Sequence, residues 1–377
     1  MHGITGRMGL NQHLIRSIAG IIKEGGVSLS NGDKVMPDPL LLGRDLKKLS
    51  QVANENSIKR FTDDYQAAFK SSEDTLFFDA GSTQMRPSLL LQAIEANKNI
   101  YCEKPLGLKL DDAIAICTAA KKRGLKTGIV QDKLFLPGLL KLRTLIDSGS
   151  LGKILSLKID FGYWVFDGET HPAQRPSWNY QKENGGGIIF DMMSHWQYIL
   201  DNLISPVTAV SCLGVNHIRA RRDENNQSYQ ADADDAAYVT VELEGGAIAQ
   251  INSSWCTRVY RDDLAFFQVD GTKGSAVAGL TSCKYQSMEN TPTPVWNPDE
   301  PQAVNFYKQW KEVEGQGKYD NAFKHQWQLF IRHLYEDAPW NHTLEEGVKG
   351  VQFAEAAMKS WSDRRWVAIN EIDFQHE

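Results

Sequence analysis

Asp191 and His195 are four residues apart in a stretch with helical apolar spacing, from about Gly187 to Leu203. On a helix, residues four apart share a face, with Cβ atoms about 5–6 Å apart. A histidine can take the proton of an alcohol hydroxyl, and a nearby carboxylate can orient the ring and stabilise its charged form. A solvated Asp–His pair on a helix surface is the alternative. Two residues are too few for a closed zinc site, so we predict no metal.

A glycine-rich loop, Gly3-Ile-Thr-Gly6-Arg7-Met8-Gly9, stands directly before a helical stretch from Leu10 to Ile22. Glycines let backbone amides approach a pyrophosphate, whose negative charge the helix N-terminus favours. The spacing differs from the commoner G-x-G-x-x-G, so an ordinary tight turn is the alternative. We predict that Gly6, Arg7, Met8 and Gly9 contact a dinucleotide.

The next strand, expected at 40–42, ends at Gly43-Arg44-Asp45. NAD enzymes commonly carry a carboxylate at this place, whereas an arginine suits the 2′-phosphate of NADP. Arg44 therefore makes NADP plausible, while Asp45 could supply the carboxylate for NAD. The sequence leaves NAD and NADP open.

Lys104 precedes Pro105 and follows an apolar strand at 99–102. The proline biases the Lys104 backbone toward an extended conformation. Beside a cationic nicotinamide, its amine could bind the substrate oxygen, with a lowered pKa. A solvated surface lysine is the alternative. Glu103 could position the nicotinamide ribose or the loop, and Gln131 could reach the nicotinamide or the substrate.

The elements that must position these residues fall into two parts. Up to about residue 130, short apolar runs at 40–42, 76–78 and 100–102 alternate with helical patterns, which is typical of a parallel sheet with helices on both faces. Beyond 150, alternating runs at 154–163, 237–243, 247–253 and 264–269 predict a mostly antiparallel sheet. Helices are expected at 187–203, 322–335 and 344–360, and a surface loop at 288–299. We predict domains at 1–128 and 129–377, with a C-terminal portion that could return to the first.

All ten tryptophans lie from Trp164 onward, so the two parts of the chain also differ in their aromatic composition. Trp164, Arg175 and Trp178 fall in one stretch before the Gly185 turn. Aromatic faces and bidentate donors suit a carbohydrate. Packing within a sheet or at a subunit interface is the alternative.

Two further motifs, Glu103-Lys104-Pro105 and Gly185-Gly-Gly-Ile-Ile-Phe-Asp191-Met-Met-Ser-His195, together with the glycine loop, resemble those of the Gfo/Idh/MocA oxidoreductase family. The resemblance covers nearly the whole chain. It implies a Rossmann-like, doubly wound N-terminal domain and a C-terminal α/β domain with a large open sheet that mediates dimers or tetramers. It implies Lys104, Asp191 and His195 as catalytic residues and a cofactor role for the turn with Ser82 and Thr83. Here Arg86 stands where a histidine is common.

The expected activity is hydride transfer between NAD or NADP and a hydroxyl-bearing carbon of a sugar, glycoside or polyol, with Lys104, Trp164, Arg175, Trp178, Asp191 and His195 facing the substrate. A redox-neutral glycosidase that retains its cofactor, and a non-catalytic ligand sensor, are the alternatives. Forty-one basic against 47 acidic residues disfavour a nucleic-acid binder.

The five cysteines are scattered, which indicates reduced thiols in a cytoplasmic protein. No apolar run approaches the ~20 residues of a membrane span, and no secretory leader is expected. Only Met1 and His2 precede the first glycine, so a start upstream of Met1 is possible.

Overall fold

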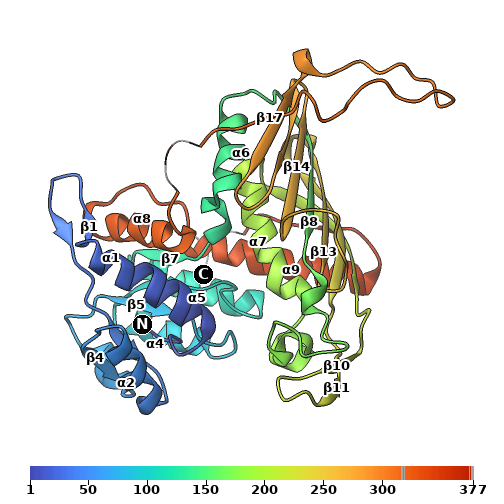
Figure 1. Ribbon diagram of the computed structural model, residues 1–377. Helices are drawn as coiled ribbons and strands as arrows, with labels where there is room; N and C mark the ends of the chain where they lie inside the picture. The colour runs from blue at the N-terminus through green and yellow to red at the C-terminus, as the bar shows by residue number, and fades with distance from the viewer. Residues whose placement is uncertain (316, 318, 373, 375–377) are drawn as a thin grey trace.

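The computed structural model describes residues 1–315, 317, 319–372 and 374, which form two lobes side by side (Figure 1). The first lobe holds two parallel sheets. One pairs β3 (Leu40–Leu42) with β4 (Arg60–Thr62), and the other pairs β5 (Leu76–Asp79), β6 (Asn99–Cys102) and β7 (Thr127–Ile129). The predicted α/β first domain is therefore confirmed, and β7 extends one residue past the expected boundary at 128.

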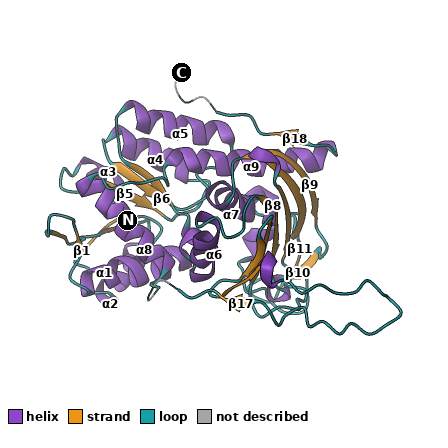
Figure 2. Ribbon diagram, turned by 90° about the horizontal axis from the view of Figure 1, so that it is seen from above, coloured by secondary structure: helices purple, strands orange, loops and turns teal. Residues whose placement is uncertain are grey.

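Helices on both faces of these strands bury the apolar stripes that the sequence carries (Figure 2). The stretch expected as one helix from Leu10 to Ile22 is a π-helix, η1 (Gly9–Ala19), continued by the short α1 (Gly20–Lys23). Asp45 and Asp64 cap two others, because each carboxylate accepts a backbone N–H three residues on. The remaining elements of the lobe are β1 (Val27–Ser28), β2 (Lys34–Val35), α2 (Leu46–Glu55), α3 (Tyr65–Lys70), α4 (Arg86–Glu95) and α5 (Leu110–Lys122).

The second lobe is built on a nine-stranded sheet in the order β17-β16-β15-β14-β8-β13-β12-β9-β18. Neighbouring strands are antiparallel except β8 and β13, which run parallel. The predicted hairpin is present, and its turn contains Gly245 and Gly246 with φ of 82° and 87°. The strands are β8 (Ile154–Phe161), β9 (Val207–Val215), β12 (Ala236–Leu243), β13 (Ile248–Ser254), β14 (Ala265–Gly271), β15 (Gly274–Ala278), β16 (Cys283–Ser287), β17 (Lys311–Glu312) and β18 (Val367–Ala368).

One face of this sheet is covered by helices α6 (Pro137–Asp147), α7 (Ile188–Leu203) and α9 (Leu344–Asp363) (Figure 2). The other face carries exposed apolar side chains, among them Leu213, Tyr238 and Ile248. Short elements fill the connections: η2 (Asp132–Phe135), η3 (Trp164–Phe166), η4 (Ser177–Tyr180), η5 (Lys182–Asn184), η6 (Glu244–Gly246), η7 (Met288–Asn290) and the pair β10 (Ala220–Arg222) and β11 (Ser228–Gln230). Among the residues described, none of the helices combines the length and hydropathy that a membrane crossing needs.

The C-terminal helices return to the first lobe. Helix α8 (Ala322–Glu336) packs on η1, and α9 packs on both α5 and α7. Trp327 and Phe330 of α8 lie against Phe78 and Tyr101 of the parallel sheet, with ring centroids 4.6–4.9 Å apart. The aromatic core of the first lobe is therefore completed by residues from the far end of the chain.

Candidate active site

The glycine loop lies at the carboxyl ends of β3 and β5, where it forms one wall of a cleft of about 580 Å³. Gly3 has φ of 76°, and a Cβ on it would fall 2.3 Å from the Ala80 backbone. A Cβ on Gly9 would fall 2.4 Å from the Gly3 carbonyl oxygen. The loop therefore needs these glycines, and the cleft lies at the carboxyl ends of parallel strands from both sheets, where folds of this kind bind dinucleotides.

The predicted cofactor residues divide between this cleft and its surroundings. Gly6, Arg44 and Ser82 line the cleft, together with Lys48 of α2. Arg7 and Met8 are exposed at the helical end of the loop, directly before η1, and Thr83 is half-buried beside Ser82. Glu103, Lys104 and Gln131 lie outside the cleft lining, at the ends of β6 and β7.

Asp45 is engaged by α2. Its carboxylate accepts the Lys48 N–H at 3.0 Å and lies 3.7 Å from the Lys48 ammonium. The backbone hydrogen bond from Lys48 is the main reason that the pKa of Asp45 is lowered. The turn after β3 and the first turn of α2 thus present two cations, Arg44 and Lys48, beside a carboxylate that already caps the helix.

A buried ion pair lies under this cleft. Asp79 accepts from Arg86 Nε and binds His2 Nδ1, each at 2.6 Å, and burial alone would raise its pKa. The Arg86 and His2 contacts outweigh burial and hold the pKa of Asp79 at about 2. Arg86 also donates to the carbonyl oxygens of Gly81 and Pro105. It therefore ties the loop containing Lys104 to the cofactor cleft.

Glu103 is fixed by a chain of buried groups from three elements. Trp327 Nε1 donates to His13 Nδ1 at 3.0 Å, so His13 must carry its proton on Nε2 and donate it to Glu103 Oε1 at 2.8 Å. The other Glu103 oxygen accepts the Lys104 N–H. Glu103 thus joins this buried chain to the backbone of Lys104, and its role toward the nicotinamide ribose or the loop stays a prediction.

Lys104 bridges the two lobes. Its ammonium donates to Asp191 Oδ1 at 3.0 Å and to the Asp191 carbonyl oxygen at 2.8 Å. Arg175 donates to Asp191 Oδ2 at 2.6 Å, and its guanidinium stacks 4.5 Å from the Trp255 ring. Burial opposes ionisation of Asp191, but Arg175 and Lys104 outweigh it and hold its pKa well below the usual range.

His195 lies one turn further along α7, with different partners. Its Nδ1 is 2.7 Å from the Tyr198 hydroxyl, and its Nε2 is 3.2 Å from Lys133 Nζ. Burial, and then the cations Lys104 and Lys133, hold the pKa of His195 well below 6.5. The ring is therefore neutral at pH 7 and can accept a proton.

The structure corrects one expectation about this pair. Asp191 does not orient His195, because both of its oxygens are taken by Lys104 and Arg175. Tyr198 orients the ring instead. Tyr198 in turn lies 3.5 Å from Asp132 Oδ1.

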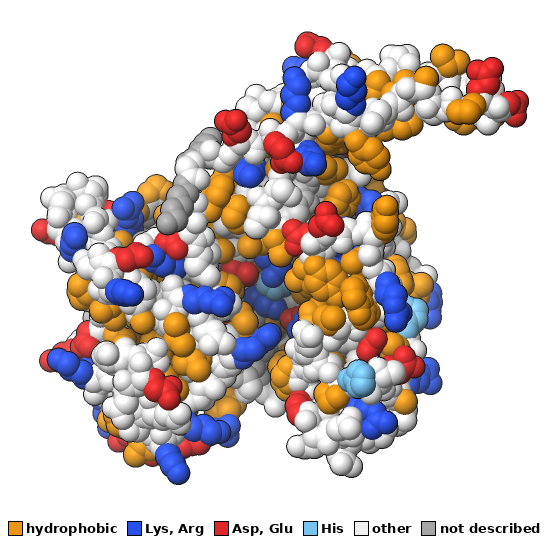
Figure 3. All heavy atoms as spheres, viewed as in Figure 1, with side chains coloured by type: hydrophobic (Ala, Val, Ile, Leu, Met, Phe, Trp, Pro, Cys, Tyr) orange, Lys and Arg blue, Asp and Glu red, His pale blue; other side chains and the backbone are white. Residues whose placement is uncertain are grey.

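The remaining predicted residues lie at the edges of this cluster. Gln131 is buried, and its side-chain oxygen binds His342 Nδ1 at 2.5 Å. Trp164 and Trp178 stay 41% and 50% exposed on the segment that carries Arg175. Figure 3 shows a hollow between the lobes with acidic, basic and histidine side chains at its floor.

Sequence reasoning missed Lys133, Tyr198, His13 and Trp327. Tyr198 could have been found, since it is three residues after His195 on a predicted helix. His13 and Trp327 are 314 residues apart, and nothing local signals their contact. In the described part of the chain, no three His, Cys, Asp or Glu side chains converge as metal ligands would.

Comparisons with known proteins agree with this architecture. Residues 40–130 match the family model described as "Oxidoreductase family, NAD-binding Rossmann fold", and residues 139–277 match "GFO/IDH/MocA C-terminal domain". The chain is 46% identical over 376 residues to a D-xylose dehydrogenase of Paenarthrobacter nicotinovorans, covering 99% of this chain and 97% of that protein.

Two other relatives are more distant. An NAD⁺-dependent scyllo-inositol 2-dehydrogenase of Bacillus subtilis is 27% identical over 241 residues, covering 63% of this chain and 65% of that protein. The solved structure of a levoglucosan dehydrogenase with NADH and levoglucosan superposes with a TM-score of 0.81 at 16% identity, covering 98% of each chain. At that identity the superposition shows the fold.

Proposed function

The chain belongs to the Gfo/Idh/MocA family of NAD(P)-dependent sugar oxidoreductases, and from that premise we propose that it oxidises a hydroxyl-bearing carbon of an aldopentose such as D-xylose. The observation that carries this proposal is the 46% identity to a D-xylose dehydrogenase over 99% of the chain. The bound nicotinamide would accept the hydride from that carbon.

The residues of this chain handle the proton and the charge. We assign the base to His195, because its neutral ring keeps an acceptor nitrogen, Nε2, on the side of Lys133. When the C–H bond of that carbon breaks, the hydroxyl proton passes to Nε2 and a C=O bond forms at the carbon. Lys104 would donate a hydrogen bond to the same oxygen, and Asp191 and Arg175 would hold Lys104 in place.

We assign Trp164, Trp178 and Arg175 to the sugar-facing wall. The support is their common segment, the exposed rings of the two tryptophans and the bond from Arg175 to Asp191. Apolar C–H faces of a sugar stack on such rings.

We also propose that the site accepts NADP as well as NAD. Arg44 and Lys48 line the cleft at the tip of β3, and Asp45 is committed to the helix cap. A 2′-phosphate would gain charge-assisted hydrogen bonds there. Arg44→Ala should raise KM for NADP about tenfold and KM for NAD less than threefold, since one such bond contributes about 1.5 kcal/mol.

Two smaller proposals concern assembly and location. The open sheet face exposes Leu213, Tyr238 and Ile248 between 37% and 41%, so we propose a homodimer or homotetramer through this face. Light scattering should give a particle mass that is a multiple of the 42.4 kDa of one chain, and Leu213→Glu should lower this measured mass.

The five cysteines are unpaired, which supports the cytoplasmic location.

The activity test is a panel of aldopentoses, hexoses and polyols with each cofactor, followed by formation of the reduced cofactor. We expect an aldopentose to have the highest kcat/KM, and a hexose or polyol tenfold better would refute this substrate class. Lys104→Met and His195→Asn should each lower kcat at least ~100-fold with unchanged cofactor Kd.

Matched controls for these two variants are Lys109→Met and His217→Asn, both at exposed positions. They should retain the parental rate. Release of nitrophenol from a nitrophenyl xyloside without net reduced cofactor would favour the glycosidase instead, and inactivity on every sugar would favour the sensor.

A further inference from the structure

A long arm, residues 291–310, leaves the nine-stranded sheet between β16 and its edge strand β17. The two strands are antiparallel and pair Tyr285 with Lys311, so the arm leaves and re-enters the sheet at one place. It contains neither helix nor strand, and a turn at 297–300 forms its tip. Figures 1 and 2 both show it extending beyond the sheet on the side away from helices α6 and α7. The arm therefore projects on the open side of the sheet, away from the cleft between the lobes.

The large side chains of the arm are exposed. Trp296 is 93% exposed and Tyr307 86%. From Pro292 to Trp310, every hydrogen bond that the described residues make stays within the arm. Exposed aromatic groups of this size mark interaction surfaces, where Trp and Tyr contribute much of the binding energy. The arm also loses little conformational entropy on docking, because four prolines fix φ along it: Pro292, Pro294, Pro298 and Pro301.

The tip of the arm is acidic. Asp299 and Glu300 stand three and four residues after Trp296, and both are exposed. Figure 3 shows acidic side chains at the end of the arm. A surface that accepts the tip must therefore offer aromatic side chains and positive charge together.

The open sheet face carries a hollow of about 480 Å³, which we call the sheet hollow. Four of its lining residues pair across β12, β13, β8 and β14 and so share that face: Tyr238, Asn252, Asp160 and Phe266. The next residue along each of these strands is buried toward the helices of the other face. The fully exposed Tyr260 adds a further ring to the wall, and such rings suit an indole.

The sheet hollow also carries positive charge. Arg258 and Arg261 line it against one aspartate, Asp160, which is engaged by Lys158 at 3.3 Å and by Asn252 at 2.9 Å. Arg261 donates to backbone carbonyl oxygens. Among the described residues, no carboxylate pairs with Arg258 or Arg261. The sheet hollow therefore lacks the carboxylates that the tip of the arm supplies.

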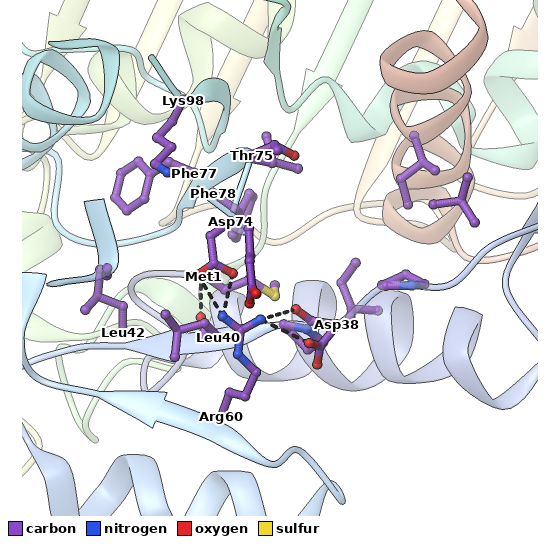
Figure 4. A pocket seen from close by; sticks show the side chains of 18 of the residues that line it. Met1, Asp38, Leu40, Leu42, Arg60, Asp74, Thr75, Phe77, Phe78 and Lys98 are labelled. Atoms are coloured by element: carbon purple, nitrogen blue, oxygen red, sulfur yellow. Dashed lines mark hydrogen bonds and ion pairs between the residues drawn. The ribbon is translucent and has the colours of Figure 1, made fainter. Parts of the chain in front are cut away.

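A cavity of about 280 Å³ in the first lobe is less suited to the arm. Figure 4 shows its Arg60 held between Asp38 and Asp74, with ion-pair distances of 3.0 and 2.7 Å. Its Lys98 donates to the Ser71 carbonyl oxygen. Each cation among the described residues that line this cavity therefore already has a partner, and charge favours the sheet hollow as the acceptor of the arm.

The arm and the sheet hollow lie at opposite ends of the strands. Phe267, next to a residue of the sheet hollow, is level with Cys283 through Ala278. Strand β16 runs on from there to Ser287, about 14 Å further, before the arm begins. When two copies pack face to face about a two-fold axis perpendicular to their strands, the strands run in opposite directions. The arm of each copy then reaches the sheet hollow of the other.

We propose that the arm of one copy lies along the open sheet face of a second copy and seats Trp296 in the sheet hollow of that copy. Asp299 and Glu300 pair there with Arg258 of the second copy. The exchange is mutual, because a two-fold contact uses the same surfaces on both copies. This inference rests on the proposed association through the sheet face, and it adds the segment that fixes the orientation of the two copies.

The first test measures self-association by sedimentation velocity over a range of protein concentrations. Trp296→Ser should raise the dimer dissociation constant at least ~30-fold, because both arms lose their main anchor. Tyr335→Ser removes an exposed aromatic side chain from α8 and should leave the constant within about twofold. An unchanged constant for Trp296→Ser would overturn the arm exchange, even where Leu213→Glu gives a monomer and the association through the sheet face stands.

The second test reverses the charges. Asp299→Arg with Glu300→Arg should raise the dissociation constant about tenfold, and adding Arg258→Glu should return it to within about threefold of the parent. Asp63→Arg with Glu95→Arg makes the same change of net charge on the first lobe and should leave the constant near the parental one. A triple variant that associates more weakly than the double variant would overturn the pairing.

The third test locates the tip with a short bismaleimide. Asp299→Cys with Arg258→Cys should give a covalent dimer, whereas Asp299→Cys with Lys273→Cys should not, because Lys273 lies at the arm's end of the strands. The parent, whose five cysteines are buried or half-buried, and each single variant give the background. A cross-link within one chain in the first variant, or a covalent dimer in the second variant alone, would overturn the proposal.

Discussion

The Tyr198 hydroxyl should decide which nitrogen of His195 acts as the base. Lys133 donates to Nε2, so the Nδ1 proton faces Tyr198 at 2.7 Å. Tyr198→Phe keeps the ring and removes this acceptor. The buried Nδ1–H then has no partner, and the ring can adopt the other tautomer, with its proton on the nitrogen that must accept one.

The size of the effect follows from the lost bond. Leaving a buried donor without its partner costs about 1–3 kcal/mol. At about 1.4 kcal/mol per factor of ten, this predicts a fall in kcat/KM for the sugar of roughly 5- to 150-fold. The Kd for the dinucleotide should change less than twofold, because Tyr198 does not line the cofactor cleft.

The assay is the initial rate of reduced-cofactor formation across sugar concentrations, with cofactor Kd measured by fluorescence. Tyr285→Phe is the matched control, since its hydroxyl donates to the Ser150 carbonyl at 3.3 Å, far along the chain from the site. A Tyr198→Phe enzyme with kcat/KM within twofold of the parent would refute the tautomer argument. An equal loss in Tyr285→Phe would assign the effect to general destabilisation.

Three further outcomes follow from the site. Asp191→Asn should lower the thermal midpoint, because Lys104 and Arg175 lose their part-buried carboxylate partner at a cost of about 1–3 kcal/mol, and it should reduce kcat at least ~100-fold, because Lys104 is no longer held in place; a parental midpoint by calorimetry would contradict this. Trp327→Phe should lower the urea-derived free energy of unfolding by about 1–3 kcal/mol, since His13 Nδ1 loses its donor, and an unchanged urea midpoint would be the contrary result. Burial lowers the pKa of His342 to about 4 in the folded protein. As the pH falls below 6.5, His342 is therefore protonated in the unfolded chain before it is protonated in the folded one. Stability should then fall by up to ~1.4 kcal/mol per pH unit between pH 6.5 and 4, less steeply in His342→Gln, as urea midpoints at pH 7.5, 6 and 5 would show.

The two-domain fold could be predicted because its signals are local. Each apolar run, glycine turn or helical pattern can be recognised within a window of about 10–20 residues. The hairpin at Gly245 and the helices near 187, 322 and 344 therefore occur where the sequence predicts them. The π-helical form of η1 has no such signal, because its 3.6-residue apolar stripe is that of an ordinary helix.

The site was only partly predictable for a related reason. Lys104, Asp191 and His195 come together, but their pairing depends on the approach of the two lobes. Arg175 competes for Asp191 from 16 residues away and Lys133 reaches His195 from 62 residues away. Helical spacing alone favoured a contact between Asp191 and His195. It carries no information on Arg175 and Lys133, which bind these two side chains instead.

The return of α8 to the first lobe has a consequence for synthesis on the ribosome. Phe78 and Tyr101 are made early, but Trp327, Phe330 and Trp340, which cover them, follow about 200 residues after β7. At ~5–20 residues per second, the half-finished cofactor lobe waits roughly 10–40 s with its aromatic core uncovered. During that interval it is a natural client for a chaperone that binds exposed apolar surface, and a nascent chain released before α8 should aggregate rather than bind dinucleotide.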